Sequence, residues 1–357
     1  MMRFRTGVLL TLMLFMVGLG IYALMTVRDL GEFREITPKE PPNCQPVLGV
    51  NSSEDITIDP ETGIAYISGA DRQGFRGEFL PGEIYSYPLL STPVQPTVLA
   101  TEIEFEFRPH GLSLYRCPDG TRLLFVVNHR SEGDYVEIFE LQDTDLVHRE
   151  SITGDLLFSA NDIVAVGERQ FYATRDHRYR AGWARQLEEY LRLGTSSVIY
   201  FDGSEFAIVA EDIAYANGIN LGRDAKRLYV AATLTGSVHV FDRDPTTGNL
   251  DPKEEIALGT GADNIEMGPD GDLWIAAHPK LLTFVDYSLD PSLLSPSQVI
   301  RLTFLDDGEH RVDTVYMSEG EYLSGSSVAA RWGNYLLIGS VFDQRFLLCR
   351  METTPTK

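Results

Sequence analysis

The chain has 357 residues, of which 43% are hydrophobic and 23% are charged, an ordinary composition for a globular protein. Asp and Glu outnumber Lys and Arg by 52 to 30, which gives a formal net charge of −22. This charge disfavours nucleic acids and anionic surfaces as partners, and it gives cations such as Ca²⁺ a favourable long-range field.

Residues 1–30 differ in composition from the rest of the chain. Arg3 and Arg5 precede Gly7–Met25, a run of uncharged and mostly apolar residues that is long enough to cross a membrane. No small-x-small cleavage site follows the run, and Arg28 comes soon after it. We predict an uncleaved signal anchor, with the basic end in the cytoplasm and the body on the periplasmic, extracellular or lumenal side. A cleaved signal peptide is the alternative.

A polar linker with several prolines, residues 31–43, separates the anchor from the folded domain that we expect over residues 44–357. The chain has three cysteines, so at least one stays unpaired. A bridge between Cys44 and Cys349 would tie the two ends of the domain together, and it would need the oxidising compartment that the anchor implies. Cys117 lies in a turn and is expected to be the free thiol.

One strand–turn–strand pattern recurs along this domain. In its clearest copy, Ile219–Leu221 and Arg227–Ala231 carry alternating β-branched, aromatic and aliphatic residues around a polar turn. The six copies begin at Glu54, His110, Asn161, Asn217, Asp263 and Ser326. Repeats spaced by roughly 45–65 residues are typical of four-stranded sheets arranged radially. We therefore predict an all-β fold, a six-bladed β-propeller.

The first residue of every copy is polar and occupies the same position in the repeat. The innermost strands of all blades start at the same end of the central channel, so these six side chains should converge on one ring. The next strand of each blade runs back antiparallel, and its end returns to the same face. Three of those ends carry histidines, His129, His177 and His278.

A short segment after His177 breaks the strand pattern. Trp183, Leu187, Tyr190 and Leu191 are spaced as on one face of an amphipathic helix. Because this helix follows a strand end on the ring side, we predict a short helical lid over the site. A helix that fills a gap between two blades is the alternative.

The ring has the chemistry of a hard-cation site. Five side chains offer oxygens at one repeat phase: Glu54, Asn161, Asn217, Asp263 and its neighbour Asn264. Calcium takes about six to eight oxygen ligands, so waters or a substrate oxygen would complete the shell. Zinc or iron would require clustered His or Cys. Asp55 and Asp162, one residue further along their strands, could hold a second ion deeper in the channel.

His110 and His129 lie on adjacent strands of one predicted blade, so their rings can approach each other. An imidazole beside a cation and supported by a second imidazole suits a general base that deprotonates water. A purely structural role for both histidines is the alternative. No G-x-S-x-G motif is present in the sequence.

These residues and motifs resemble the paraoxonase/arylesterase family, calcium-dependent six-bladed propellers that hydrolyse lactones and aryl esters. The resemblance covers about Pro42–Arg350. It rests on PPNC (Pro41–Cys44), SED (Ser53–Asp55), RPHGLS (Arg108–Ser113), VVNH (Val126–His129), NDIVAVG (Asn161–Gly167), RDH (Arg175–His177), ANGIN (Ala216–Asn220), DN (Asp263–Asn264) and DLWIAAHP (Asp272–Pro279).

The resemblance implies two calcium ions and a role for each matching residue. The family's catalytic calcium ligands match Glu54, Asn161, Asn217, Asp263 and Asn264. Its structural calcium ligands match Asp55, Asp162 and the backbone carbonyl of Leu112. Its histidine dyad matches His110 and His129, its pocket histidines match His177 and His278, and its disulfide partners match Cys44 and Cys349.

The chain departs from the family in the substrate walls. Ala70–Phe75, ADRQGF, stands where the family often has a Tyr on an active-site loop. The aromatic residue beside the ANGIN motif is Tyr215, and Ala277 stands where family members may carry a free cysteine.

We therefore predict a calcium-dependent lactonase and arylesterase that acts on a small lactone or ester. Calcium would polarise the carbonyl, and His110, oriented by His129, would activate water, with Glu54 or Asp263 as other candidates for the base. Two alternatives are a sugar-lactonase-type calcium propeller and a non-catalytic, membrane-tethered binding propeller. The intact His110–His129 pair disfavours the binding propeller.

Overall fold

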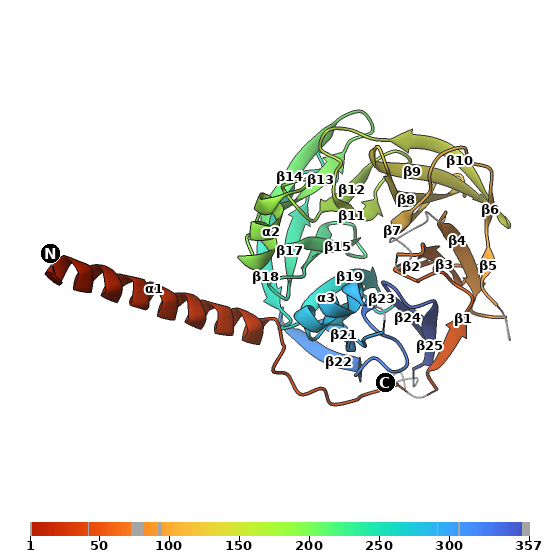
Figure 1. The fold of residues 1–357 in the computed structure, drawn as a ribbon. Coiled ribbons are helices and arrows are strands. Elements are labelled where there is room, and N and C mark those ends of the chain that lie inside the picture. The colour runs from red at the N-terminus through yellow and green to blue at the C-terminus, as the bar shows by residue number, and fades with distance from the viewer. Residues whose placement is uncertain are drawn as a thin grey trace.

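Six β-sheets stand radially around a central axis in the computed structural model of the chain (Figure 1). The structure describes residues 2–41, 43–72, 81–91, 95–290, 292–305 and 308–351, with no side chains described for residues 2–9. The predicted six-bladed β-propeller is thus confirmed. Helix α1 (Met2–Asp29) projects away from the disc, and the described residues form two further helices, α2 (Trp183–Tyr190) and α3 (Leu281–Leu289).

Each blade is a meander in which consecutive strands pair from the axis outward. The innermost strands are β2 (Asp55–Ile58), β7 (Pro109–Arg116), β11 (Ala160–Ala165), β15 (Ala216–Leu221), β19 (Gly261–Met267) and β23 (Ser326–Trp332). The second strands are β3 (Ile64–Gly69), β8 (Arg122–Arg130), β12 (Phe171–Arg175), β16 (Arg227–Ala232), β20 (Leu273–His278) and β24 (Tyr335–Ser340).

The outer half of each blade completes the sheet. The third strands are β4 (Glu83–Pro88), β9 (Gly133–Gln142), β13 (Ser196–Phe201), β17 (Ser237–Arg243), β21 (Ser297–Phe304) and β25 (Arg345–Arg350). The outer strands are β5 (Thr97–Val98), β10 (Asp145–Ile152) with β6 (Ala100–Thr101) beside it, β14 (Phe206–Ile213), β18 (Leu250–Ala257), β22 (His310–Ser318) and β1 (Gln45–Leu48).

The two ends of the propeller domain meet in the last blade. Strand β1 pairs antiparallel with β25, so the first strand of the domain is the outer strand of the final sheet. A disulfide joins Cys44, just before β1, to Cys349 within β25. Cys117 is buried and unpaired. The predicted pairing and the predicted free thiol are both confirmed, and the ring of blades is closed covalently.

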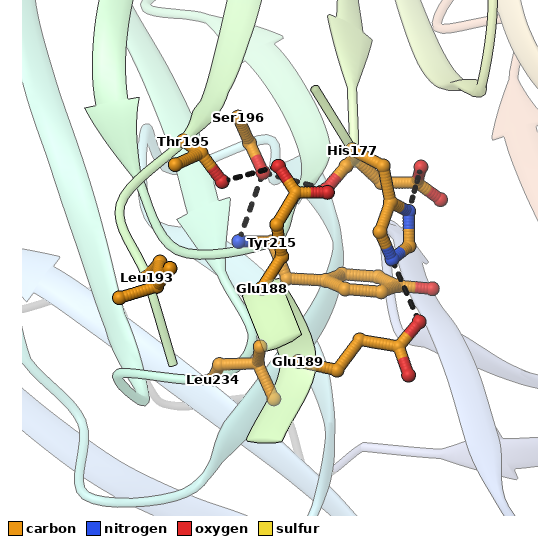
Figure 2. Close-up of a pocket in the computed structure, with 9 residues that line it drawn as sticks. His177, Glu188, Glu189, Leu193, Thr195, Ser196, Tyr215 and Leu234 are labelled. Carbon is orange, nitrogen blue, oxygen red and sulfur yellow. Dashed lines mark hydrogen bonds and ion pairs between the residues drawn. The ribbon is translucent and has the colours of Figure 1, made fainter. Parts of the chain in front are cut away.

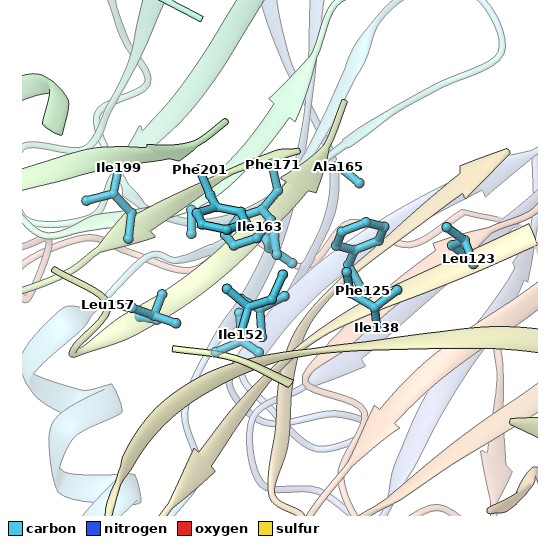
Figure 3. Packing of buried hydrophobic residues seen from close by; sticks show 14 of the residues in the cluster. Leu123, Phe125, Ile138, Ile152, Leu157, Ile163, Ala165, Phe171, Ile199 and Phe201 are labelled. Atoms are coloured by element: carbon cyan, nitrogen blue, oxygen red, sulfur yellow. The ribbon is translucent and has the colours of Figure 1, made fainter. Parts of the chain in front are cut away.

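The hydrophobic core lies between neighbouring blades and not on the axis. Side chains alternate between the two faces of a strand, so each sheet presents apolar residues to the blades on both sides. Figure 3 shows one such layer, where Phe125 on β8 and Ile138 on β9 face Phe171 on β12 and Phe201 on β13. The Phe125 and Phe171 rings meet edge to face with 6.1 Å between centroids. Because apolar packing is completed between blades, the strand ends at the channel mouth are free to carry polar groups.

Helix α1 leaves the propeller beside α2 and α3. Its residues Leu10–Asp29 are long and apolar enough to cross a membrane, with a mean hydropathy of 2.1 and no residue of the apolar window buried in the fold. Asp29 at its end forms an ion pair with Arg192 (3.4 Å), just after α2. The Glu32 carboxylate accepts backbone N–H groups of Leu282 and Thr283 in the first turn of α3, at 2.7 and 3.2 Å. An acidic group stabilises a helix at this end.

Helix α2 is the helix that the apolar spacing predicts, but its apolar face points outward. The side chains of Trp183 and Tyr190 are 74% and 71% exposed. The buried residue of the helix is Glu188, whose carboxylate accepts the backbone N–H of Arg178 (3.0 Å) and the Thr195 hydroxyl (2.6 Å). The helix is therefore attached to the propeller through polar contacts, and it leaves an aromatic surface exposed.

Candidate functional site

The innermost strands share a distortion at the position where the predicted site residues lie. In five blades the register between the first and second strand shifts at this point, a β-bulge that leaves extra residues unpaired. The bulged segments of four of these blades contain His110, Asn161, Asp162, Asn217, Asp263 and Asn264. In the remaining blade, Glu54 directly precedes β2. The bulges turn consecutive side chains toward the channel mouth, which explains how Asp263 and Asn264 can serve one site.

Two glycines allow the innermost strands to approach each other closely. A Cβ atom on Gly111 would lie 2.6 Å from the Asp162 Cα atom, and one on Gly218 would lie 2.5 Å from the Asn264 Cα atom. Both distances are shorter than any ordinary contact, so neither position accepts a side chain without a shift of the backbone. The glycines of the PHG and NGI motifs therefore set the spacing of the ring.

Four of the five candidate calcium ligands have a buried oxygen with no hydrogen-bond donor among the described residues. These atoms are Glu54 Oε2, Asn161 Oδ1, Asn217 Oδ1 and Asn264 Oδ1. Buried polar atoms are nearly always paired, because an unpaired one loses the hydration it would have in water. Four such oxygens in one set of predicted ligands are therefore available to a cation or to hydrogen-bond donors outside the described residues.

The hydrogen-bond network fixes which atom of two amides is left unpaired. The Thr233 hydroxyl donates to the backbone oxygen of Ala262 (2.6 Å), so it must accept from Asn217 Nδ2 (3.1 Å). Asn264 Nδ2 donates to Glu54 through both the backbone oxygen and Oε1, each at 3.2 Å. In both amides the donor nitrogen is used and Oδ1 is left over. Oxygen is the ligand that calcium prefers.

No group of three or more His, Cys, Asp or Glu side chains in the described part of the chain is arranged as a metal site. The five candidate calcium ligands do not form such a group, since three of them are amides. The other two are the carboxylates Glu54 and Asp263, and the Asp263 oxygen Oδ2 contacts His278 Nε2 at 2.8 Å. The donor set fits a hard cation, not a zinc or iron ion.

Asp55 and Asp162 are buried and connect neighbouring blades. Asp55 Oδ2 accepts the backbone N–H of Leu112 (2.6 Å), and Asp162 Oδ2 accepts that of Ile219 (2.8 Å). Burial, followed by the charge of neighbouring carboxylates, raises the pKa of both groups well above its usual range. Burial and the nearby Asp55 likewise raise the pKa of Glu266, which the sequence did not mark. Such a cluster of buried acids is costly unless protons or a cation balance it.

The structure brings His110 and His129 together as predicted from the blade pattern. Their rings meet edge to face with 4.9 Å between centroids. His129 Nδ1 contacts Asp134 Oδ1 at 2.8 Å, and the other oxygen of Asp134 accepts the backbone N–H of Ala160 (2.9 Å). Asp134 therefore orients His129 and joins two blades. It follows the VVNH motif across a tight turn, where the sequence alone gave no reason to select it.

Arg72 also reaches this pair, although it belongs to no recognised motif. Its guanidinium donates to His110 Nδ1 (2.8 Å) and to the Pro109 backbone oxygen (2.9 Å). Because a guanidinium can only donate, Nδ1 of His110 must be the unprotonated nitrogen. The ring proton of neutral His110 then lies on Nε2, 3.3 Å from Glu54 Oε1. Burial, assisted by the charge of Arg72 and opposed by Glu54, lowers the pKa of His110.

His177 lies in a small pocket between α2 and the neighbouring blades (Figure 2). Its Nδ1 atom contacts Asp176 (2.6 Å) and its Nε2 atom contacts Glu189 of α2 (2.8 Å). Burial alone would lower the pKa of His177, but the hydrogen bonds to both carboxylates outweigh it and raise the pKa to about 9. The ring of Tyr215 meets His177 edge to face at 5.1 Å. Helix α2 thus contacts a predicted pocket residue directly.

His278 lies at the end of β20 and is held by two contacts. Besides its contact with Asp263, it stacks on Phe284 of α3, with 3.7 Å between the ring centroids. Ser326, the sixth residue of the predicted ring, is oriented differently. Its hydroxyl lies within hydrogen-bond distance of the backbone oxygens of Ala277 (3.2 Å) and Gln298 (3.1 Å), so it is used in contacts with the neighbouring blade.

Comparisons with known proteins find relatives that match nearly the whole chain. The sequence profile of the arylesterase family matches residues 35–351. Serum paraoxonase/arylesterase 2 of Rattus norvegicus is 36% identical, over 97% of this chain and 100% of its own length. Serum paraoxonase/arylesterase 1 of Homo sapiens is 37% identical, over 90% of this chain and 92% of its own length.

Solved structures with the same fold are more distant in sequence. Regucalcin from Agrobacterium tumefaciens, described as a calcium-binding protein, superposes with a TM-score of 0.52 at 16% identity, over 91% of this chain and all of its own. A gluconolactonase from Xanthomonas campestris superposes with a TM-score of 0.52 at 14% identity, over 90% and 99% of the two chains. These likenesses establish the propeller fold alone.

The family match covers nearly the whole propeller, and the relatives share more than a third of their residues with this chain over at least nine-tenths of it. This confirms the predicted family, and with it the predicted enzyme class, an arylesterase or lactonase hydrolase. The chain belongs to the arylesterase family.

Proposed function

We propose that this protein is a calcium-dependent hydrolase of lactones and aryl esters, with its active site at the mouth of the propeller channel. The observation that carries the proposal is the set of buried, unpaired oxygens on Glu54, Asn161, Asn217 and Asn264. Membership of the arylesterase family supports the reaction class.

The catalytic calcium ion would be held by the unpaired oxygens together with the Asp263 carboxylate. A bound calcium ion supplies Lewis-acid polarisation of an ester carbonyl. His278 orients Asp263 by its contact with Oδ2, which leaves Oδ1 for the site. A second, structural ion would be held by Asp55, Asp162 and the backbone oxygen of Leu112. A cation at this place would offset the burial and the like charges that raise the pKa of both aspartates.

His110 is the proposed general base, and His129 and Asp134 position it. The lone pair on His110 Nδ1 can take a proton from water, since that nitrogen is unprotonated in the observed arrangement. This transfer requires Arg72 to give up its contact with the same nitrogen. Asp134 fixes the ring of His129, and His129 packs against His110 and limits its movement.

We further propose that the domain lies on the non-cytoplasmic side of a membrane and is held there by residues 1–30. The 20-residue apolar segment of α1 and the exposed aromatic face of α2 support this arrangement. The Cys44–Cys349 disulfide fits an oxidising compartment. Release of the protein into the soluble fraction with a new N-terminus near residues 26–30 would contradict the anchor.

Hydrolysis of a panel of substrates tests the proposal. The panel contains γ- and δ-lactones, phenyl acetate and a sugar lactone, each measured with calcium and again after treatment with a chelator. We expect calcium-dependent turnover of the simple lactones and of phenyl acetate. Turnover of the sugar lactone alone would indicate a sugar lactonase, and no turnover of any compound would favour a binding propeller.

A further inference from the structure

Arg72 is a buried cation placed directly at the candidate site. Its side chain is only 13% exposed, and it follows β3 of the first blade. Its two terminal nitrogens donate to His110 Nδ1 and to the Pro109 backbone oxygen. Its third nitrogen, Nε, is buried and has no partner within the described residues. The guanidinium therefore enters the site with donor capacity that the described residues leave unused.

The charge balance around Arg72 changes when a calcium ion is bound. Its NH2 group lies 4.0 Å from Glu54 Oε2, beyond hydrogen-bond distance. The two carboxylates of the candidate site, Glu54 and Asp263, together balance one calcium ion. The guanidinium would then be a mostly buried charge without a counter-charge of its own, which is unfavourable. A bound anion would remove this cost.

We propose that Arg72 recognises an anionic group of the substrate, so that the site prefers lactones or esters that carry a carboxylate or a similar anion. The proposal rests on the proposed function and deepens it by naming the substrate class. The planar guanidinium fork suits a carboxylate, because it can donate two parallel hydrogen bonds to the two oxygens.

Recognition of the anion also affects the proposed base. A guanidinium that turns toward a substrate carboxylate gives up its bond to His110, and the lone pair on Nδ1 becomes accessible to water. A neutral ester has no anionic group that competes with His110 for the guanidinium. Arg72 therefore favours anionic substrates in two ways. It binds the anionic group, and its movement frees Nδ1 of His110 to accept a proton from water.

A matched pair of esters tests this inference. Phenyl acetate and 4-acetoxybenzoate share the acetyl ester and differ by one carboxylate. At saturating calcium, Arg72→Met should lower the ratio of kcat/KM for 4-acetoxybenzoate over that for phenyl acetate by about 10–100-fold, the size of a charge-assisted hydrogen bond. The ratio of the two kcat/KM values, and not the rate on either ester alone, is the readout. Arg72→Lys keeps the charge without the fork and should restore part of the ratio.

Two further measurements separate this inference from its alternatives. Arg169→Met removes an exposed cation that pairs with Glu150 on the outer surface, and it should leave the ratio unchanged. Calorimetric titration with benzoate, and with benzamide as the neutral control, should show benzoate binding to wild type and much weaker binding to Arg72→Met.

An equal loss of activity on both esters, or equal benzoate binding by wild type and Arg72→Met, would overturn the assignment of Arg72. The binding measurement does not depend on turnover. If wild type hydrolyses neither these esters nor any lactone of the panel but binds benzoate through Arg72, the proposed function fails and the assignment of Arg72 stands.

Discussion

Two parts of the site differ in where they come from in the fold. We call the first part the axis cluster, and it consists of Glu54, Asn161, Asn217, Asp263 and Asn264. We call the second part the pocket wall, and it consists of Arg72, His177, Glu189, Tyr215 and Phe284. The axis cluster occupies one position that the blades repeat, whereas most of the wall comes from loops and helices that individual blades add.

The two parts also differ in how their polar groups are satisfied. Four oxygens of the axis cluster, on Glu54, Asn161, Asn217 and Asn264, are buried and unpaired among the described residues. In the wall, His177 is paired on both nitrogens, with Asp176 and Glu189. We therefore expect an external cation to stabilise the axis cluster, whereas the polar groups of His177 are already paired. Mutations in the two parts should have different effects on calcium binding, turnover and stability.

The largest effect is expected from Asp263→Ala in the axis cluster. This change removes one of two charged ligands, so both calcium affinity and turnover should fall, the turnover by about 10⁴-fold or more. Calcium binding and hydrolysis of a lactone are the two measurements. Asp242→Ala, which removes a 55% exposed carboxylate on β17, is the control and should change neither. Wild-type calcium affinity in Asp263→Ala would remove Asp263 from the ligand set.

His110→Gln should separate the role of the base from the role of the metal. The variant lacks the proposed base and changes no candidate ligand, so turnover should fall by about 10²–10⁴-fold. The rise in melting temperature on adding calcium should stay close to that of wild type. Retention of more than about a tenth of the activity would mean that a ring carboxylate activates the water. Loss of calcium binding would mean that the ligand assignment is wrong.

Cys349→Ser tests whether the axis cluster depends on closure of the ring. The disulfide joins residues separated by 305 positions, and its loss should lower the free energy of unfolding by about 2–4 kcal/mol. Denaturant unfolding under non-reducing conditions measures this. Cys117→Ser is the matched control, because Cys117 is also buried but forms no bridge, and it should have a smaller effect. Equal effects of the two variants would show that closure of the ring adds little to the free energy of unfolding.

The smallest effect is expected in the wall, from Glu189→Gln. The pKa of His177 is about 9 in the folded protein against 6.5 ordinarily, so protonated His177 stabilises the fold. This contribution is complete below about pH 6.5 and is lost as the pH rises through 9. Because Glu189 is 43% exposed, we expect a loss of less than about 1 kcal/mol.

Melting temperatures of wild type and Glu189→Gln should therefore differ at pH 6 and converge by pH 10. Glu132→Gln removes a 54% exposed carboxylate near Arg130 and serves as the control, with no such convergence expected. A difference that stays constant with pH would show that Glu189 acts through packing and not through the charge of His177.

The axis cluster and the pocket wall also differ in how much of them could be predicted from the sequence. The propeller was predicted correctly because each repeated strand pattern is local. The disulfide was predicted correctly because its two cysteines lie at the two ends of the domain. The axis cluster could be selected because one repeat position carried Asn161, Asn217 and Asp263 at the same phase. The bulges that turn these side chains inward leave no residue signature, since pairing register depends on the neighbouring strand.

The wall was predicted less completely. Arg72 and Glu189 reach the site only through the path of their own loop or helix, which no repeat constrains. Asp134 orients His129 from across a turn and resembles any turn aspartate in the sequence. Helix α2 was predicted from its apolar spacing, but the outward direction of Trp183 could not be, because burial of Glu188 decides it.

Calorimetric titration of calcium into metal-stripped wild-type protein tests the central claim most directly. The unpaired oxygens of Glu54, Asn161, Asn217 and Asn264 predict saturable calcium binding. Removal of calcium should abolish lactone hydrolysis, and added calcium should restore it over the concentration range in which calcium binds. Stripped protein that binds no calcium, or that hydrolyses lactones at the full rate without it, would contradict the account.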